Sequence, residues 1–176
     1  MEATIDGMAF RALSYGLYVV TSKGGKKDNG QIANTVFQVT SNPPRMAACI
    51  NKENLTHACI SDCGVFGVSV LEEATPLPFI GRFGFKSGRE TDKLEGVETM
   101  EGPSGCPLVT EHAVAVMEIR VVDRVDSGTH SLFIGEVTFA KVLSRKPPLT
   151  YAAYHEKKRG KTPPKAPTYQ GNDSPE

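Results

Sequence analysis

The 176-residue sequence lacks tryptophan, long apolar runs and any net charge. Its 20 basic residues balance its 20 acidic residues, which argues against a nucleic-acid platform held by bulk charge. No apolar run approaches the roughly 20 residues that a membrane-spanning helix needs. The amino terminus also lacks the basic and apolar regions of a secretory signal. We therefore expect a cytoplasmic protein whose partners are neither nucleic acid nor membrane.

Cysteine is scarce, and its spacing fits no disulfide framework. Cys59 and Cys63, with His57 nearby, resemble part of a metal-ligand set, but a structural zinc site needs four donors and no second pair exists. The alternative is that these cysteines are buried and reduced. We expect no metal site.

β-Branched and alternating segments dominate the sequence, so we expect a mainly β protein. The predicted strands lie at 15–22, 32–39, 46–50, 65–71, 113–123 and 131–143. Asn29-Gly30 suits a hairpin turn after the first strand, and 124–130 joins the last two strands as a second hairpin. Short helices are expected at 55–63, which Gly64 ends, and from Thr75. Long antiparallel strands with few helices indicate a β-barrel with helical insertions.

The composition changes near residue 156, after a region of 1–155 that is long enough for one domain. Residues 156–176 interleave lysine and arginine with proline, and such a segment cannot build a core of its own. We expect a Pro/Lys-rich, extended C-terminal arm that either wraps a partner subunit through Tyr169 or is disordered.

Small polar side chains are concentrated on the two strands that flank Asn42–Arg45. Such a set suits a ligand with hydrogen-bonding ring edges and an anionic tail, and the helix that begins after Asn54 adds N–H groups that favour an anion. The alternative is an antiparallel pair with a solvated face, followed by a well-capped helix. The polar residues on and after these strands are Asn34, Thr35, Gln38, Thr40, Ser41, Asn51, Lys52, Asn54 and Thr56.

Five segments occur together in an order that closely resembles the flavin reductase-like family of FMN-binding split barrels. They are SYGLYVVTS at 14–22, NGQIANTVFQVTS at 29–41, CINKENLTH at 49–57, FGVSVL at 66–71 and GTHSLFIGEV at 128–137. The nearest branch is that of the NAD(P)H:ferric-iron reductases and flavoredoxins. The resemblance covers nearly the whole chain. It implies a Greek-key antiparallel split barrel that forms a homodimer, with FMN held near the subunit interface.

The resemblance also implies which residues hold FMN. Asn34, Thr35 and Val36 are expected along the isoalloxazine ring, and Lys93, with Arg89, is expected to clamp the phosphate. The other expected contacts surround the ring or follow the ribityl chain to the phosphate: Gln38, Thr40, Ser41, Cys49, Asn51, Lys52, Asn54 and Thr56.

The implied chemistry is hydride transfer from NAD(P)H to FMN, followed by electron delivery to ferric chelates, free flavin or another small-molecule or protein acceptor. The catalytic candidates are His130, on the nicotinamide side, and Cys49, beside the ring. Alternatively, His130 is only a hairpin turn residue and Cys49 a buried thiol with no redox role. A different function is that of a flavoredoxin-like FMN carrier that exchanges electrons with a protein partner rather than with NAD(P)H. A third is that of a non-catalytic flavin-binding module.

Overall fold

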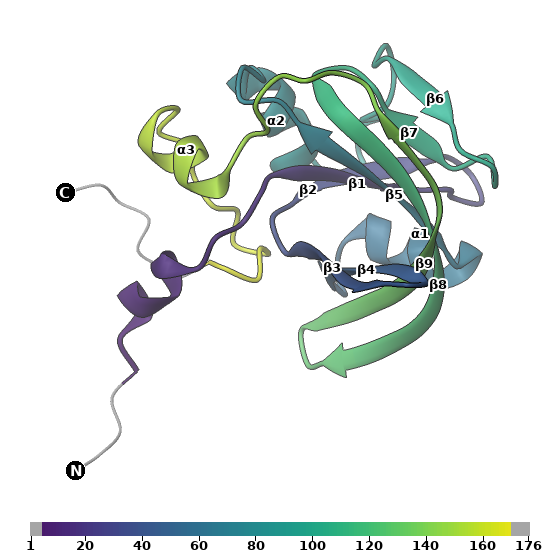
Figure 1. Ribbon diagram of the computed structural model, residues 1–176, viewed down its shortest axis with the longest axis horizontal. Helices are drawn as coiled ribbons and strands as arrows, with labels where there is room; N and C mark the ends of the chain where they lie inside the picture. The colour runs from purple at the N-terminus through teal and green to yellow at the C-terminus, as the bar shows by residue number, and fades with distance from the viewer. Residues whose placement is uncertain (1–4, 170–176) are drawn as a thin grey trace.

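Antiparallel strands form the body of the chain, of which the computed structural model describes residues 5–169 (Figure 1). Every pairing between the named strands is antiparallel. The expected mainly β fold with short helices is therefore confirmed. The strands are β1 (Tyr18–Ser22), β2 (Asn29–Ala33), β3 (Val36–Ser41), β4 (Pro44–Asn51), β5 (Val65–Leu71), β6 (Thr99–Glu101), β7 (Pro107–Val109), β8 (Ala113–Ser127) and β9 (His130–Val142). The helices are the 3-10 helix η1 (Gly7–Ala12) and the α-helices α1 (Leu55–Cys63), α2 (Leu77–Gly84) and α3 (Tyr151–Glu156).

Seven strands form one sheet that closes on itself. Its order is β2-β1-β5-β8-β9-β4-β3, so β2 and β3 lie at its opposite edges. Only Asn34 and Thr35 separate these two strands along the chain, which brings the edges together. Sheet twist and register shifts after Glu118 and Val121 curve the long β8–β9 hairpin (Figure 1). The result is the expected antiparallel barrel, split between β2 and β3.

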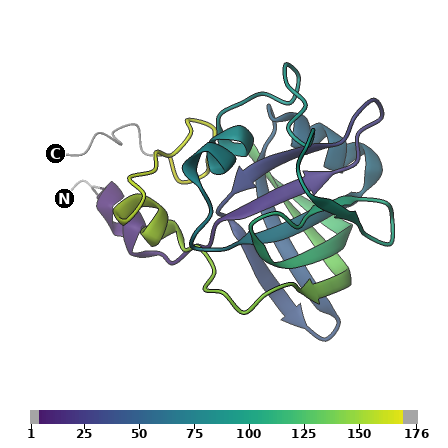
Figure 2. The same ribbon diagram turned by 90° about the horizontal axis from the view of Figure 1, so that it is seen from above.

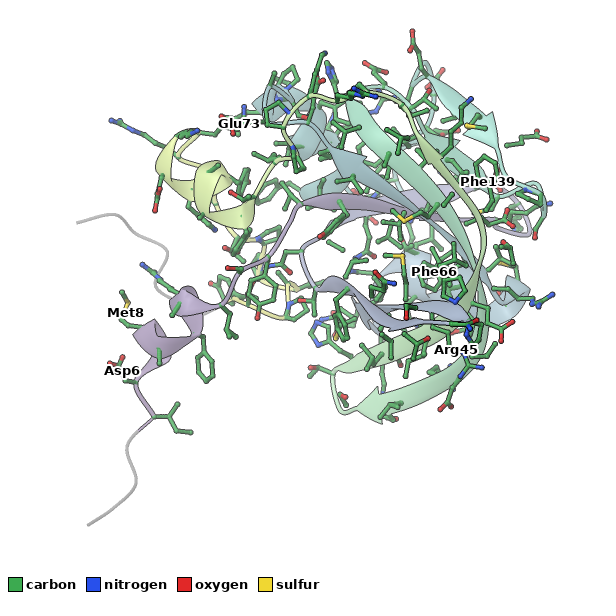
Figure 3. All side chains as sticks on the ribbon, viewed as in Figure 1. Asp6, Met8, Arg45, Phe66, Glu73 and Phe139 are labelled. Carbon is green, nitrogen blue, oxygen red and sulfur yellow. The ribbon has the colours of Figure 1, made fainter. Side chains whose placement is uncertain are left out.

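The barrel interior is filled by apolar side chains from all seven of these strands and from α1. Phe66 lies near its centre and has no exposed surface (Figure 3). Burial of apolar surface of this kind is the main favourable term in folding. α1 ends at Gly64, whose φ of 69° is the left-handed conformation that such a helix end requires.

A second core lies outside the barrel, where α2 and α3 pack near β1 and β5. Phe79, Ile80 and Phe83 of α2 are buried there with Leu149 and Tyr154. Figures 1 and 2 place α3 and η1 at the same end of the molecule. The two cores hold α2 and α3 beside the split in the barrel, where β2 and β3 separate.

Three expectations about strands and turns are wrong in detail. Asn29 and Gly30 do not form the turn but begin β2, where they pair with Ser22 and Thr21, so residues 23–28 make the connection. The run at 32–39 is not one strand, because the chain leaves β2 at Ala33 and starts β3 at Val36 on the other edge of the sheet. The final hairpin is tighter than expected, since β8 continues to Ser127 and only Gly128 and Thr129 form the turn. The small β6–β7 pair was also not expected, because β6 falls in a glycine-rich connection.

The described part of the C-terminal arm packs against its own chain. α3 ends at Glu156, beside the expected boundary, and residues 157–169 contain neither a strand nor a helix. The Asn34 amide donates a hydrogen bond of 2.7 Å to the Thr168 hydroxyl. Thr168 therefore brings the arm back to the end of β2. Residues 170–176 lie outside the described part.

Candidate functional site

A cavity of about 310 Å³ lies where the split barrel meets the segments outside it. Its walls come from β2, the end of β4, the first turn of α1, the loop 84–89, and the arm residues 161–167. The geometry therefore gathers parts of the chain that are far apart in sequence. The sequence-predicted residues that line it are Asn34, Cys49, Asn51, Asn54, Thr56, Arg89 and Lys93.

The wall near β2 is fixed by a buried hydrogen bond. The Asn29 amide donates to the Thr56 hydroxyl at 2.8 Å, and both side chains are buried. Gly88 packs against the same Asn29, so closely that a Cβ at this position would collide with Asn29 Oδ1. The contact fixes the loop 84–89, and with it Arg89, against the start of β2.

The first turn of α1 faces the cavity without a side-chain cap. Asn54 occupies the N-cap position, but its side chain makes no capping hydrogen bond. Thr56 is turned toward Asn29, and Asn51 Oδ1 accepts the backbone N–H of Glu53 at 2.9 Å. The helix end therefore keeps N–H groups that can meet an anion.

Lys93 is a buried cation in the cavity wall. Only 4% of its surface is exposed, and its Nζ donates to the Phe83 carbonyl oxygen at 3.3 Å. No carboxylate in residues 5–169 lies within ion-pair distance of it. Burial lowers the pKa of Lys93 to about 8. A buried ammonium without a counter-ion is costly, so an anionic ligand at this point would stabilise it.

Gln31 also lines the cavity, and sequence reasoning missed it. Its Oε1 is buried and has no hydrogen-bond partner, whereas its Nε2 contacts the Ile32 carbonyl at 3.5 Å. A donor on a ligand in the cavity would satisfy this acceptor. The missed signal was the period of two along β2, which puts Asn29, Gln31 and Ala33 on one face.

The rim of the cavity carries more positive than negative charge. Lys86, Arg89, Lys161 and Lys165 line it together with a single carboxylate, Glu53. The Lys165 ammonium pairs with Glu53 at 2.9 Å, and the Arg89 guanidinium donates to the Glu53 carbonyl at 3.0 Å. The excess of cations favours an anionic ligand.

His130 meets the arm rather than the cavity. Its Nε2 lies 3.2 Å from the Lys165 carbonyl oxygen, and its Nδ1 lies 2.8 Å from the Thr129 hydroxyl. Asn51 donates to the same Lys165 carbonyl at 3.4 Å. The arm therefore joins His130 to the residues that line the cavity.

Six other predicted residues do not line the cavity. Lys52 instead forms an ion pair of 2.7 Å with Asp126. Val36 is buried in the barrel core, and the Gln38 amide donates to the Thr40 carbonyl at 3.1 Å within β3. The full set comprises Thr35, Val36, Gln38, Thr40, Ser41 and Lys52.

Cys49 lies at the cavity wall on β4 and is half-buried. Burial raises the pKa of its thiol. The thiol is therefore protonated at neutral pH, which suits packing rather than nucleophilic or redox chemistry.

Comparison with known proteins places this geometry in a family. The flavin reductase-like domain matches residues 10–159, which is most of the chain. A ferric-chelate reductase (NAD(P)H) from Archaeoglobus fulgidus is 55% identical over 94% of this chain and 98% of its own length. A high molecular weight rubredoxin from Moorella thermoacetica is 51% identical over 94% of this chain and 72% of its own length.

The fold is also similar to that of solved structures. A Streptomyces globisporus NADH:FAD oxidoreductase, solved in complex with NAD and FAD fragments, superposes with a TM-score of 0.73 at 26% identity. That match covers 86% of this chain and 93% of the other. With a domain match over most of the length and a relative at 55% identity, the chain belongs to the flavin reductase-like family.

Proposed function

We propose that this chain is a flavoprotein oxidoreductase that binds FMN in the cavity, takes hydride from NAD(P)H and passes electrons to a ferric chelate, free flavin or another acceptor. The observation that carries the proposal is Lys93, a buried cation in the wall of a ligand-sized cavity, with no counter-ion among residues 5–169. The chain is 55% identical to a ferric-chelate reductase (NAD(P)H), which supports this choice of reaction.

The residues around the cavity fit FMN. Lys93 and the uncapped first turn of α1, beginning after Asn54, provide positive charge and N–H donors for a phosphomonoester. Gln31 offers an unsatisfied acceptor to a ring N–H, and Asn34 offers an amide at the junction of β2 and β3. Arg89 adds charge at the rim.

In the proposed reaction the protein binds and orients, while the cofactor carries the hard chemistry. A bound flavin supplies a ring that accepts hydride and releases electrons one or two at a time. Lys93 holds the phosphate end, and the arm residues 161–164 exclude water from the cavity. His130 positions the nicotinamide, and Cys49 packs beside the ring as a neutral thiol. This mechanism requires neither a nucleophile nor a carboxylate pair.

We also propose that the chain forms a homodimer through one outer face of the sheet. Register pairs Phe37 with Ala47 and Ala47 with Ile134, and it likewise pairs Leu132 with Val125. Cross-strand partners share a face of the sheet. Phe37 and Val125 are 48% and 45% exposed on this outer apolar face. An apolar face of this kind favours association.

Cys49 pairs with Leu132 and lines the cavity, so the proposed FMN site adjoins the interface.

We propose that the protein is located in the cytoplasm. All four cysteines are free thiols, and Cys59 and Cys106 are buried, which suits a reducing compartment. Among the described residues, no helix has the length and apolar character needed to cross a bilayer.

A second candidate function is that of an FMN carrier that serves a protein partner rather than NAD(P)H. The observation that favours it is the contact between the Lys165 carbonyl and His130 Nε2. This contact uses the atom that the nicotinamide is expected to bind. The basic rim would also suit an acidic protein surface.

The visible spectrum of the purified protein, followed without oxygen after addition of NADH and then NADPH, tests these functions. We expect a yellow protein whose flavin absorbance bleaches within seconds. A yellow protein that stays oxidised with both nucleotides supports the carrier function. A colourless protein that takes up no added FMN contradicts the proposed site.

A further inference from the structure

Two side chains on neighbouring strands converge on one carbonyl oxygen. Asn51, the last residue of β4, and His130, the first residue of β9, are direct cross-strand partners. Asn51 Nδ2 and His130 Nε2 lie 3.4 Å and 3.2 Å from the Lys165 carbonyl oxygen. We call Asn51 and His130 the carbonyl-binding pair.

Both members of the pair are held with a donor toward this point. A carbonyl oxygen can only accept, so His130 carries its proton on Nε2 and accepts the Thr129 hydroxyl at Nδ1, 2.8 Å away. Asn51 uses Oδ1 to accept the Glu53 N–H at 2.9 Å, which turns its NH₂ group toward Lys165. The pair therefore presents two fixed N–H donors to any carbonyl at the edge of the cavity.

The present occupant of the pair is attached firmly at one end and weakly at the other. At residues 161–162 the arm is anchored, because the Tyr154 hydroxyl donates to the Lys161 carbonyl at 3.0 Å and the Thr162 side chain is buried against Tyr151. At 165–168, which we call the arm tip, the side-chain contacts are an exposed ion pair from Lys165 to Glu53 and the hydroxyl contacts of Thr168. The exposed ion pair contributes little, and the two hydrogen bonds of the Thr168 hydroxyl are the main side-chain contacts that hold the tip, so the tip can leave while the anchor stays.

We propose that the carbonyl-binding pair is a carboxamide site, which the Lys165 carbonyl occupies in the resting chain and from which the carboxamide of the nicotinamide nucleotide displaces it. The inference rests on the proposed function, because it requires a nicotinamide co-substrate. A peptide carbonyl and a primary carboxamide offer the same acceptor, so the pair recognises both. The arm tip then acts as an internal competitor, and it lowers the apparent affinity for the nucleotide by the fraction of chains in which it is seated.

Loosening the arm tip in the full-length, FMN-loaded protein tests the competition. The double variant Lys165→Gln with Thr168→Val removes the ion pair and the hydroxyl contacts while leaving the carbonyl-binding pair intact. We expect the apparent dissociation constant for NADH or NADPH, taken from the saturation of the flavin bleaching rate, to fall about threefold to tenfold. The limiting bleaching rate comes from the same titration, so a change in hydride transfer is kept apart from a change in nucleotide affinity.

Lys157→Gln is the matched control for this experiment. Lys157 lies outside the arm tip, and its ammonium forms an exposed ion pair of 2.7 Å with Glu73, which the substitution removes. We expect its nucleotide affinity to equal that of the wild type. Equal nucleotide affinity in the wild type, the double variant and this control would overturn the competition, and rapid bleaching in all three would leave the proposed function standing.

Limited trypsin digestion gives a readout that does not depend on turnover. NAD⁺ carries the carboxamide but no hydride, so it should displace the tip without reducing the flavin. In the FMN-loaded protein we expect NAD⁺ to speed cleavage after Lys165 several-fold, and cleavage after Lys161, which Tyr154 anchors, to stay unchanged. Cleavage after Lys165 that is indifferent to saturating NAD⁺ would overturn the inference.

Discussion

Lys93 is the side chain whose surroundings most require a ligand, so it is the first residue to change. Lys93→Met keeps the length of the side chain and removes its charge. We expect FMN affinity to fall about 10-fold to 100-fold, because hydrogen bonds to charged groups contribute roughly 1.5–3 kcal/mol. The apo protein should be as stable as the wild type or more so, since an uncompensated buried charge is lost.

Fluorescence titration with FMN and thermal unfolding of the apo protein measure these two effects. Lys157→Met, an exposed position away from the cavity, controls for the loss of one positive charge. Lys52→Met compares the other lysine that was expected to bind FMN. Because Lys52 pairs with Asp126, we expect this variant to lose less FMN affinity than Lys93→Met. FMN binding that survives Lys93→Met at full strength would refute the assignment of the phosphate end.

The pH dependence of the same lysine gives a second prediction. Burial lowers the pKa of Lys93 from 10.5 to about 8, so the folded apo chain loses this proton before the unfolded chain does. Below about pH 8 both states hold the proton, and the folded state carries the full cost of the buried charge. Between about pH 8 and 10.5 the unfolded state binds more protons, so the contribution of Lys93 to stability rises with pH.

FMN affinity should move in the opposite direction, because the phosphate needs the charged ammonium. We expect the FMN dissociation constant to rise as the pH increases through about 8, at which the phosphate already carries its second charge. Lys93→Met should show neither this rise nor the gain in apo stability. FMN titrations and thermal melts from pH 7 to pH 10 would reveal both, and a pH dependence that persists in the variant would assign the effect to another group.

His130 is expected to act on the nicotinamide rather than on the flavin. His130→Ala should leave the FMN dissociation constant within about threefold of the wild type, because the side chain does not line the cavity. It should slow bleaching or raise the apparent dissociation constant for NAD(P)H about tenfold, the usual size of one lost hydrogen bond. Rapid-mixing spectrophotometry separates the two effects, and bleaching at the wild-type rate and affinity would remove His130 from the mechanism.

At the scale of elements, the loop 84–89 depends on a glycine that touches β2. Gly88→Ala places a Cβ against Asn29 Oδ1, so either the loop or the Asn29–Thr56 hydrogen bond must shift. We expect a loss of stability of about 1–3 kcal/mol, typical of overpacking, together with weaker FMN binding. Gly25→Ala is the matched control, because a Cβ there meets no atom within 4 Å. Equal stability and FMN affinity in the two variants would show that the contact does not hold the loop.

The elements also show what sequence patterns can and cannot predict. Local sequence patterns predicted the positions of α1, β5 and the long β8–β9 hairpin closely. Helix caps and the alternation of apolar and polar residues depend only on residues that are near one another in the sequence. The division of 32–39 was not predictable in this way, since both halves are equally β-prone. The break at Asn34 and Thr35 comes from closure of the barrel, which brings opposite edges of the sheet together. Pairing across the whole sheet sets that geometry.

The same distinction applies to the site residues, because some were predicted from the sequence and others were placed only by the fold. Lys93, Asn51 and Asn54 were named from the sequence and do line the cavity. The orientation of Lys52 was not predictable, because its partner Asp126 is 74 positions away in the chain. No pattern within the arm indicated that it covers the cavity, since its contacts depend on where α3 ends and how β2 and β4 are arranged. Long-range contacts of this kind require the fold itself.

At the scale of the whole molecule, two apolar surfaces within the described residues 5–169 are exposed in the single chain. One is the outer apolar face that contains Phe37. The other is η1, which stands away from the barrel (Figure 1) and has no buried residue, with Met8 on its surface (Figure 3). Monomeric proteins rarely leave large contiguous apolar patches uncovered. Both surfaces therefore support a second copy of the chain as the partner.

Phe37→Lys tests the proposed dimer, because it places a charge on the outer apolar face. In a C2 dimer the same patch serves both subunits, so one substitution introduces two charges into one interface. We expect the wild type to have the mass of a dimer by light scattering at micromolar concentration, and the variant to have the mass of a monomer. Val142→Lys makes the same change on β9 at a side chain that is 74% exposed, and it should remain dimeric.

The same pair of variants connects assembly to the cavity. Cys49 lines the cavity and is the register partner of Leu132 on the outer apolar face, so loss of the partner should loosen this wall. We expect FMN affinity to fall about tenfold in Phe37→Lys and to be retained in Val142→Lys. A wild-type monomer that binds FMN tightly would show that the cavity is complete within one chain, and the apolar face would then need another partner. A dimer whose dissociation weakens FMN binding would show that the site is stabilised by assembly, as the position of Cys49 predicts.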